Sequence, residues 1–356
     1  ASDKNKNNFE YKENIKEVIK NHINIIDNLL ESEYRFKLKE EIENFFKEIH
    51  DICLGIYYLK DFSNKISDKL LSYGEKISNL ILYYYFSQEL KDKKIKLMDS
   101  TQYLITDNSY SNAKIIESQT KSNFIDFNLH LSNDILIFPG FISKDENNNI
   151  TTLGRGGGDY TAALIGSNLD CELVEIWTDV NGIMTSDPRI VKNSRSIKNI
   201  SYNEMMELSH YGANVIYTPT ILPLYNKKIP LIVKNTFNPN HEGTRIDFER
   251  NSRNEIATAV SNIRKVSLIK IYGNYLIGNI GFSGSLFSLF SNYNINIIMI
   301  SQSSSEHSIY IVINQKDFEI VKYVLNKSYE KQIVTREVII DFWNNKSVLA
   351  IETNNS

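Results

Sequence analysis

Cysteine is nearly absent from this chain of 356 residues, which has only Cys53 and Cys171. The two form no CxxC pair and have no metal-ligand spacing, so they predict neither a zinc site nor a disulfide framework. We expect two packed core thiols in a reducing compartment. No residues are predicted to bind a metal directly.

Long apolar runs and a strong net charge are also missing. The longest apolar stretch, Leu80–Phe86, is far shorter than the ~20 residues of a membrane-spanning helix. The first residues are polar and show no secretory signal. The formal net charge of −3 gives no general field that would recruit nucleic acid or an anionic membrane. We therefore expect a cytoplasmic protein that binds neither.

The first hundred residues predict helices, because apolar residues recur there at helical spacing. After Lys93, short apolar runs alternate with helical patterns. The expected buried strands are 135–138, 174–177 and 229–233, and the expected helices between them are 159–169 and 201–211. This alternation predicts an α/β fold with a largely parallel sheet.

The pattern changes near Ser261. Strands at 266–272, 295–302 and 308–314 and helices at 281–293 and 318–329 follow in the order β-α-β-β-α, which is that of a ferredoxin-like unit. The polar link 238–254 predicts a boundary between domains at 1–250 and 260–356. A last strand, Val348–Ile351, is expected to begin a second unit of the same kind.

The segment Thr151–Leu164, TTLGRGGGDYTAAL, carries the strongest chemical signal. Three consecutive glycines let the backbone approach a ligand, and a helix begins directly after them. Arg155 can hold a carboxylate or a phosphate through two parallel hydrogen bonds. Asp159 stands at the helix start, where it is either a plain cap or a group that orients the reaction. The GxGxxG spacing of dinucleotide-binding loops fails here.

Two further segments are informative. A buried strand ends in Thr178 and Asp179, and ligands of α/β sheets bind at the carboxyl ends of strands. Arg189 follows in the stretch Asp187-Pro-Arg189. In the helical part, Glu75 within Tyr73-Gly-Glu-Lys76 is by itself only a carboxylate on a helix face.

Together these segments resemble the aspartate kinases. The matching stretches, in order and spacing, are TTLGRGGGDYTAAL, VEIWTDVNGIMTSDPR, SYNEMMELSHYGANVI and IPLIVKNTFNPNHEGTRI. The stretches VKNT at 233–236 and ISQSSSE at 300–306 favour the kinase part of bifunctional aspartokinase/homoserine dehydrogenases. The ferredoxin-like unit then resembles an ACT domain. The implied fold is an amino-acid-kinase α/β sandwich whose first strand is missing here, followed by this ACT domain.

The resemblance implies phosphoryl transfer from ATP, bound with Mg²⁺, to the side-chain carboxylate of L-aspartate, the first step of lysine, threonine and methionine biosynthesis. Arg155 and Asp159 would be catalytic, with Arg155 holding the substrate's α-carboxylate and Glu75 its ammonium. Thr152 and Gly158 would complete the substrate site. The nucleotide would lie at Thr178, Asp179, Met184, Arg189 and Asn214.

The ACT resemblance implies an amino-acid effector, lysine or threonine, at a seam between two edge-paired copies. The expected contacts are Asn279, Gly281, Ser283, Gln302 and Ser303. A homodimer or a higher homo-oligomer through the ACT domains is expected. A purely structural dimerisation module without a ligand remains an alternative.

The sequence also departs from the family pattern. The family's opening Lys-Phe-Gly-Gly-Thr-Ser strand is absent, and its lysine neutralises the transferring phosphate. Gly158 replaces a serine, Met184 a tyrosine and Asn214 a lysine, while Lys6 stands in place of a threonine. Because lost cationic contacts weaken transition-state stabilisation, our hypothesis is that the chain as given turns over weakly or not at all.

Two alternatives remain open at this point. One is a non-catalytic regulatory or assembly subunit that keeps a decayed kinase scaffold. The other is a different amino-acid kinase, such as a glutamate or carbamate kinase, against which the ACT unit and the WTDVNGIMTSDPR stretch argue.

Overall fold

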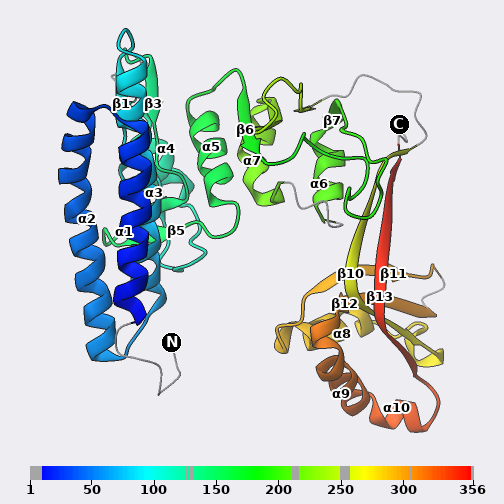
Figure 1. Ribbon diagram of the computed structural model, residues 1–356. Coiled ribbons are helices and arrows are strands. Elements are labelled where there is room, and N and C mark those ends of the chain that lie inside the picture. Colours follow the sequence, from blue (N-terminus) through cyan, green and yellow to red (C-terminus); the bar gives the residue numbers. More distant parts are fainter. Residues whose placement is uncertain are drawn as a thin grey trace. The chain divides into compact units, whose positions relative to one another are not determined.

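The computed structural model describes residues 10–125, 127, 132–210, 216–248, 257–304 and 307–353. The described residues form two compact units (Figure 1). The first is drawn from Ala1–Thr178, Ile216–Thr236 and Arg245–Phe248, and the second from Asp179–Val215, Phe237–Thr244 and Glu249–Ser356.

Three long helices open the first unit and run side by side, as Figure 1 shows: α1 (Glu10–Leu29), α2 (Ser32–Leu59) and α3 (Asn64–Glu89). They confirm the helices expected in the first hundred residues. Apolar residues three or four apart form their common core, for example Leu38 and Ile42 of α2 with Ile77 of α3. The hydroxyls of Tyr73 and Tyr84 on α3 also donate hydrogen bonds to glutamates of α2.

Short strands and helices follow within the same unit: β1 (Ile95–Leu97), β2 (Ile105–Thr106), α4 (Glu117–Asn123), β3 (Ile135–Ile137), β4 (Ile142–Asp145), β5 (Ile150–Thr152), α5 (Gly157–Asn168), β6 (Val174–Thr178), α7 (Thr218–Lys227), β8 (Leu231–Asn235) and β9 (Thr244–Asp247), whose first residue belongs to the second unit. The pairs β1–β3, β2–β4 and β6–β8 are parallel, and β4–β5 is antiparallel. The α/β class is confirmed, with the parallel pairs in separate small sheets. Strand β8 begins after Pro230, which has no N–H to donate to a ladder.

The second unit contains β7 (Asn199–Ser201), α6 (Tyr202–His210) and a ferredoxin-like part. That part consists of β10 (Ala257–Tyr272), α8 (Phe282–Asn292), β11 (Ile297–Gln302), β12 (Ser308–Asn314), α9 (Phe318–Ser328), α10 (Glu330–Val334) and β13 (Ile339–Thr353). Its antiparallel sheet has the order β11-β12-β10-β13. Leu286, Ile311 and Leu325 are fully buried between this sheet and its helices. The predicted β-α-β-β-α order is confirmed.

Strand β13 adds a fourth strand that the sequence pattern did not reveal. Its first half pairs with Ile269–Tyr272 of β10, so it belongs to the ferredoxin-like sheet. The expected strand Val348–Ile351 is the far part of the same β13 and pairs with Val260–Ile263. That it begins a second unit stays a prediction.

The two cysteines are free, and both are half-buried instead of lying in the core as expected. Cys53 lies beyond the buried stripe of α2, which comprises Leu38, Ile42 and Phe46. Partial burial still raises the pKa of both thiols.

Candidate active site

The glycine-rich segment forms a tight turn between β5 and α5. Gly154 and Gly156 have φ angles of 72° and 70°, in the left-handed region that favours glycine. The N–H of Gly157 donates to the carbonyl of Gly154 at 3.1 Å, which closes the turn. Helix α5 begins directly afterward, so the unpaired N–H groups of its first turn face the same region as the loop. This is the arrangement expected of a site for an anionic ligand.

Neighbouring segments pack closely on this turn. A Cβ atom on Gly154 would lie 2.6 Å from Oδ1 of Asn112, and one on Gly157 would lie 2.7 Å from Cδ2 of Phe141. The N–H of Phe141 in turn donates to Oγ1 of Thr161 in α5 at 3.0 Å. Gly158 differs, because a Cβ there meets no atom within 4 Å. The turn is held rigidly on one side and is open at Gly158.

Arg155 and Asp159 flank the open side. Arg155 is exposed, and Asp159 lies half-buried in the first turn of α5. Burial raises the pKa of the Asp159 carboxyl above its ordinary value. Within the described residues, neither side chain forms a hydrogen bond or an ion pair. Both charges are therefore available to a ligand.

Glu75 lies half-buried on α3, which packs against β5. Burial raises the pKa of its carboxyl, and the described residues provide no partner for that group. Beside it, the ammonium of Lys76 lies 5.4 Å from the centre of the Tyr73 ring. Burial lowers the pKa of Lys76, while the charges of Asp99 and Glu48 act in the opposite direction.

Asp68 is a residue of this region that the sequence analysis missed. Its side chain is fully buried on α3. Its carboxylate accepts hydrogen bonds from the N–H of Ser111 at 2.8 Å, the N–H of Thr152 at 2.9 Å and the hydroxyl of Thr152 at 3.0 Å. Thr152, expected to contact substrate, is thus tied to α3. The sequence feature that could have pointed to Asp68 is its spacing from Glu75, which is seven residues or about two helical turns.

The residues expected at the nucleotide fall in both units. Thr178 ends β6 in the first unit, opposite Asn235 of β8, and its carbonyl accepts the N–H of Thr236 at 2.8 Å. The carboxyl ends of these two parallel strands therefore meet. The ammonium of Lys234 lies near them, 4.7 Å from the centre of the Trp177 ring.

Asp179, Met184 and Arg189 belong to the second unit. Met184 forms an isolated antiparallel bridge with Ser196. The guanidinium of Arg189 donates two hydrogen bonds of 3.0 Å to Asp187, which lowers the pKa of that carboxyl. Asn214 lies outside the described residues. The nucleotide roles of these residues stay predictions.

The expected effector contacts lie on two segments of the ferredoxin-like part. Gly281, with a φ of 89°, caps α8, and the carbonyl of Asn279 accepts the N–H of Phe282; Ser283 follows in the first turn. Gln302 ends β11, an edge strand, and Ser303 begins the turn to β12, where its N–H donates to Ser308 at 3.1 Å. Their effector role stays a prediction.

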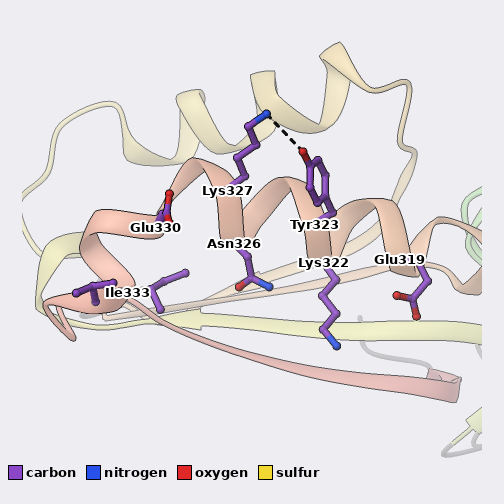
Figure 2. A pocket seen from close by; sticks show the side chains of 8 residues that line it. Glu319, Lys322, Tyr323, Asn326, Lys327, Glu330 and Ile333 are labelled. Atoms are coloured by element: carbon purple, nitrogen blue, oxygen red, sulfur yellow. Dashed lines mark hydrogen bonds between the residues drawn. The ribbon is translucent and has the colours of Figure 1, made fainter.

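A pocket of about 680 Å³ lies along α9 and α10 in the same part (Figure 2). Its lining mixes charged and apolar side chains, and Figure 2 shows the hydrogen bond between two of them, from Lys327 to Tyr323. It contains none of the predicted site residues. It is a surface groove of the ferredoxin-like part and not part of the glycine-rich site.

The described residues are informative about metals and membranes. Within this part of the chain, no group of three or more histidine, cysteine, aspartate and glutamate side chains is arranged to hold a metal ion. None of its helices combines the length and apolar composition that a bilayer span requires.

Two known protein families match this chain. The model of the amino acid kinase family matches residues 6–235, and that of the ACT domain matches residues 269–329. The chain belongs to the amino acid kinase family. Its C-terminal part carries an ACT domain.

The chain is also similar in sequence to two bifunctional enzymes. The chain is 33% identical over 320 residues to the bifunctional aspartokinase/homoserine dehydrogenase of Buchnera aphidicola, covering 89% of this chain and 38% of the relative. It is 32% identical over 334 residues to the enzyme of that name from Haemophilus influenzae, covering 91% and 40%. The chain therefore spans about two fifths of the length of these relatives.

A solved structure has the same fold. Escherichia coli aspartokinase III in complex with aspartate and ADP matches with a TM-score of 0.77 at 24% identity, over 98% of this chain and 76% of that one. This likeness supports the two-part architecture of kinase fold and ACT domain.

Proposed function

We propose that this chain is an aspartate kinase, which transfers the γ-phosphoryl group of ATP to the side-chain carboxylate of L-aspartate. The carrying observation is the glycine-rich turn, with a cation at Arg155 and a half-buried acid at Asp159, packed through β5 against the helix that bears Glu75. The aspartokinase relatives, and the aspartate and ADP in the E. coli structure, support this choice of substrate and donor.

The chemistry follows from this arrangement. A carboxylate oxygen of the substrate attacks the γ-phosphorus, the bond from that phosphorus to the bridging oxygen breaks, and ADP leaves with the electron pair. The product is an acyl phosphate, 4-phospho-L-aspartate. Such a transfer depends mainly on positioning and charge stabilisation. Arg155 would hold the α-carboxylate and Glu75 the ammonium. Asp159 would help to position the reacting groups.

The nucleotide would bind at the carboxyl end of β6 and in the segment 179–189, with Arg189 at its phosphates. Mg²⁺ would enter with ATP, because this ion is commonly held by substrate phosphates together with one or two carboxylates. The kinase part would correspond to residues 1–250 and the ACT part to 260–356.

The direct test is an acyl-phosphate assay. ATP and Mg²⁺ are supplied with L-aspartate, L-glutamate or carbamate, and the product is trapped with hydroxylamine as a hydroxamate. Hydroxamate with aspartate alone supports the proposal, and a faster reaction with either other acceptor contradicts it. Family-like turnover would also refute our hypothesis of weak activity.

Arg155→Lys separates binding from turnover. A lysine cannot form two parallel hydrogen bonds with a carboxylate, so we expect calorimetric affinity for aspartate to fall about tenfold or more while ATP affinity is kept. The matched control is Arg245→Lys, at an exposed arginine paired with Asp247. If wild-type protein binds neither aspartate nor ATP, the kinase proposal fails.

Feedback through the ACT domain is part of the proposal. Lysine is bound, together with aspartate, in a second E. coli aspartokinase III structure with a TM-score of 0.74 and 24% identity. For this chain we propose lysine or threonine as effector, at Asn279–Ser283 and Gln302–Ser303 of an ACT-paired oligomer. A ligand at 100 times its Kd stabilises a protein by ~2.7 kcal/mol. Absence of a thermal shift with either amino acid would contradict effector binding.

A further inference from the structure

We propose that Asp68 is a positioning residue that fixes the direction of the Thr152 hydroxyl, so that the site offers an acceptor to the substrate's ammonium group. This inference rests on the proposed function. It concerns the buried contact between α3 and β5, where Asp68 and Thr152 are both almost inaccessible to solvent.

The first step is the hydrogen count at Thr152. Its backbone N–H donates to Oδ2 of Asp68 at 2.9 Å, and its hydroxyl donates to Oδ1 at 3.0 Å. A threonine has one hydroxyl hydrogen, so the oxygen Oγ1 retains only lone pairs for other partners. Thr152 can therefore accept a hydrogen bond from a ligand but cannot donate one.

The neighbouring threonine does not share this role. Side chains of successive strand residues point to opposite faces, so Thr151 faces away from Thr152. The Thr151 hydroxyl lies 2.7 Å from that of Thr106 and 2.9 Å from that of Ser143. On the face of β5 that packs against α3, Thr152 is thus the hydroxyl with free lone pairs.

The second step concerns the face of α3 on which Glu75 lies. Asp68 and Glu75 are seven residues apart on α3, so they lie on nearly the same helix face, about 10 Å apart along the axis. By gripping Thr152 and Ser111, Asp68 fixes which face of α3 meets β5. Glu75 and Thr152 then both offer acceptors. Among the groups of an amino-acid substrate only the ammonium is a strong donor, since its carboxylates only accept.

The same carboxylate supports the glycine-rich turn. Ser111 donates its N–H to Asp68, and the carbonyl of Ser111 lies 3.1 Å from the position of a Cβ on Gly154. One buried side chain thereby connects α3, the 111–112 segment and the turn that carries Arg155.

The test is Asp68→Asn. Two backbone N–H groups reach Oδ2, at 2.8 and 2.9 Å, whereas Oδ1 has only the longer, shared contact of 3.0 Å from the Ser111 N–H, so the amide oxygen should take the Oδ2 position and the amide nitrogen should face Thr152. The hydroxyl would then accept from the asparagine, and its hydrogen would point toward the ligand. An ammonium would meet a donor instead of an acceptor.

The measurement compares L-aspartate with succinate, which has both carboxylates and no ammonium. In wild-type protein, calorimetry should give aspartate the tighter binding. In Asp68→Asn we expect aspartate affinity to fall about tenfold or more, while succinate affinity changes less than about threefold. ATP affinity should be unchanged. An equal loss for both dicarboxylates, or an unchanged preference for aspartate, would overturn the inference.

Two variants of Thr152 carry the test if Asp68→Asn does not fold. Thr152→Ser retains the hydroxyl and should retain the preference for aspartate; Thr152→Val removes it and should lose that preference. Equal preference in these two variants contradicts the inference. If wild-type protein does not bind aspartate, the proposed function fails, whereas a wild-type preference that survives in every variant rejects only the role of Asp68.

Discussion

The ring of Phe141 occupies the space that a side chain on Gly157 would need. A Cβ at Gly157 would lie 2.7 Å from Cδ2 of that ring and 3.2 Å from Cα of Phe141. The N–H of Phe141 donates to Oγ1 of Thr161, so the backbone of Phe141, including the Cα that this Cβ would approach, is held in place. Of the three consecutive glycines, Gly157 therefore has no room for a side chain, whereas Gly158 does.

Gly157→Ala should therefore destabilise the protein by about 1–3 kcal/mol, the usual effect of forcing an extra carbon into a packed site. Gly158→Ala is the matched control, because its Cβ enters open space and alanine favours the helix by up to about 1 kcal/mol. Urea denaturation of both variants measures the difference. Equal free energies of unfolding would contradict this account.

Glu75→Gln should stabilise the fold while weakening substrate binding. Burial raises the pKa of Glu75, so the folded state disfavours its ionised form. This carboxyl contributes favourably below its unfolded pKa, and that contribution is lost as the pH rises through the raised folded value. At pH 7 glutamine removes the penalty, and the gain in melting temperature should shrink on acidification. Aspartate affinity should fall because the charge that meets the ammonium is gone.

Glu33→Gln is the control with the opposite sign. Glu33 is exposed and pairs with Lys37 at 2.7 Å, and the hydrogen bond from Lys37 lowers its pKa. Its ionised form is therefore stabilising, and glutamine should slightly lower the melting temperature at pH 7 without affecting aspartate binding. Parallel behaviour of the two variants in stability and binding would count against a ligand role for Glu75.

Gly273→Ala should disrupt the attachment of β13 to the ACT sheet. Gly273 has a φ of 140°, and a Cβ there would lie 2.1 Å from the carbonyl oxygen of Glu337. Since the overlap is with backbone, we expect a loss of about 3 kcal/mol or more and faster amide exchange at Ile339–Phe342. Gly284→Ala, in open space on α8, should be neutral or stabilising. Native-like exchange in Gly273→Ala would refute this.

The sequence predicted features that rest on local pattern. The helical spacing of Ile42, Phe46 and Ile49, the glycine-rich turn and the β-α-β-β-α order were all visible, because each follows from the periodicity or backbone freedom of nearby residues. Arg155 and Asp159 were singled out because they stand in that turn and at the start of the following helix, and their roles stay predictions.

What escaped prediction depends on partners distant in the sequence. Asp68 could not be distinguished from a solvated acid on an amphipathic helix, because its partner Thr152 lies 84 residues away. The raised pKa of Glu75 likewise comes from burial that only tertiary packing creates. The first half of β13 was missed because an edge strand has one pairing neighbour and a weak pattern of its own.

The long ladder between β10 and β13 has a mechanical consequence. Ala257 pairs with Thr353, so the chain enters and leaves the ladder at the same end, and pairing continues from there to Tyr272 and Ile339 (Figure 1). A force that separates these two ends would break the hydrogen bonds one after another, as in opening a zipper, instead of loading them together in shear. The part of the ladder in which 257–263 pairs with 348–353 should separate at low force and re-form easily. The ACT core, where 269–272 pairs with 339–342, should remain folded.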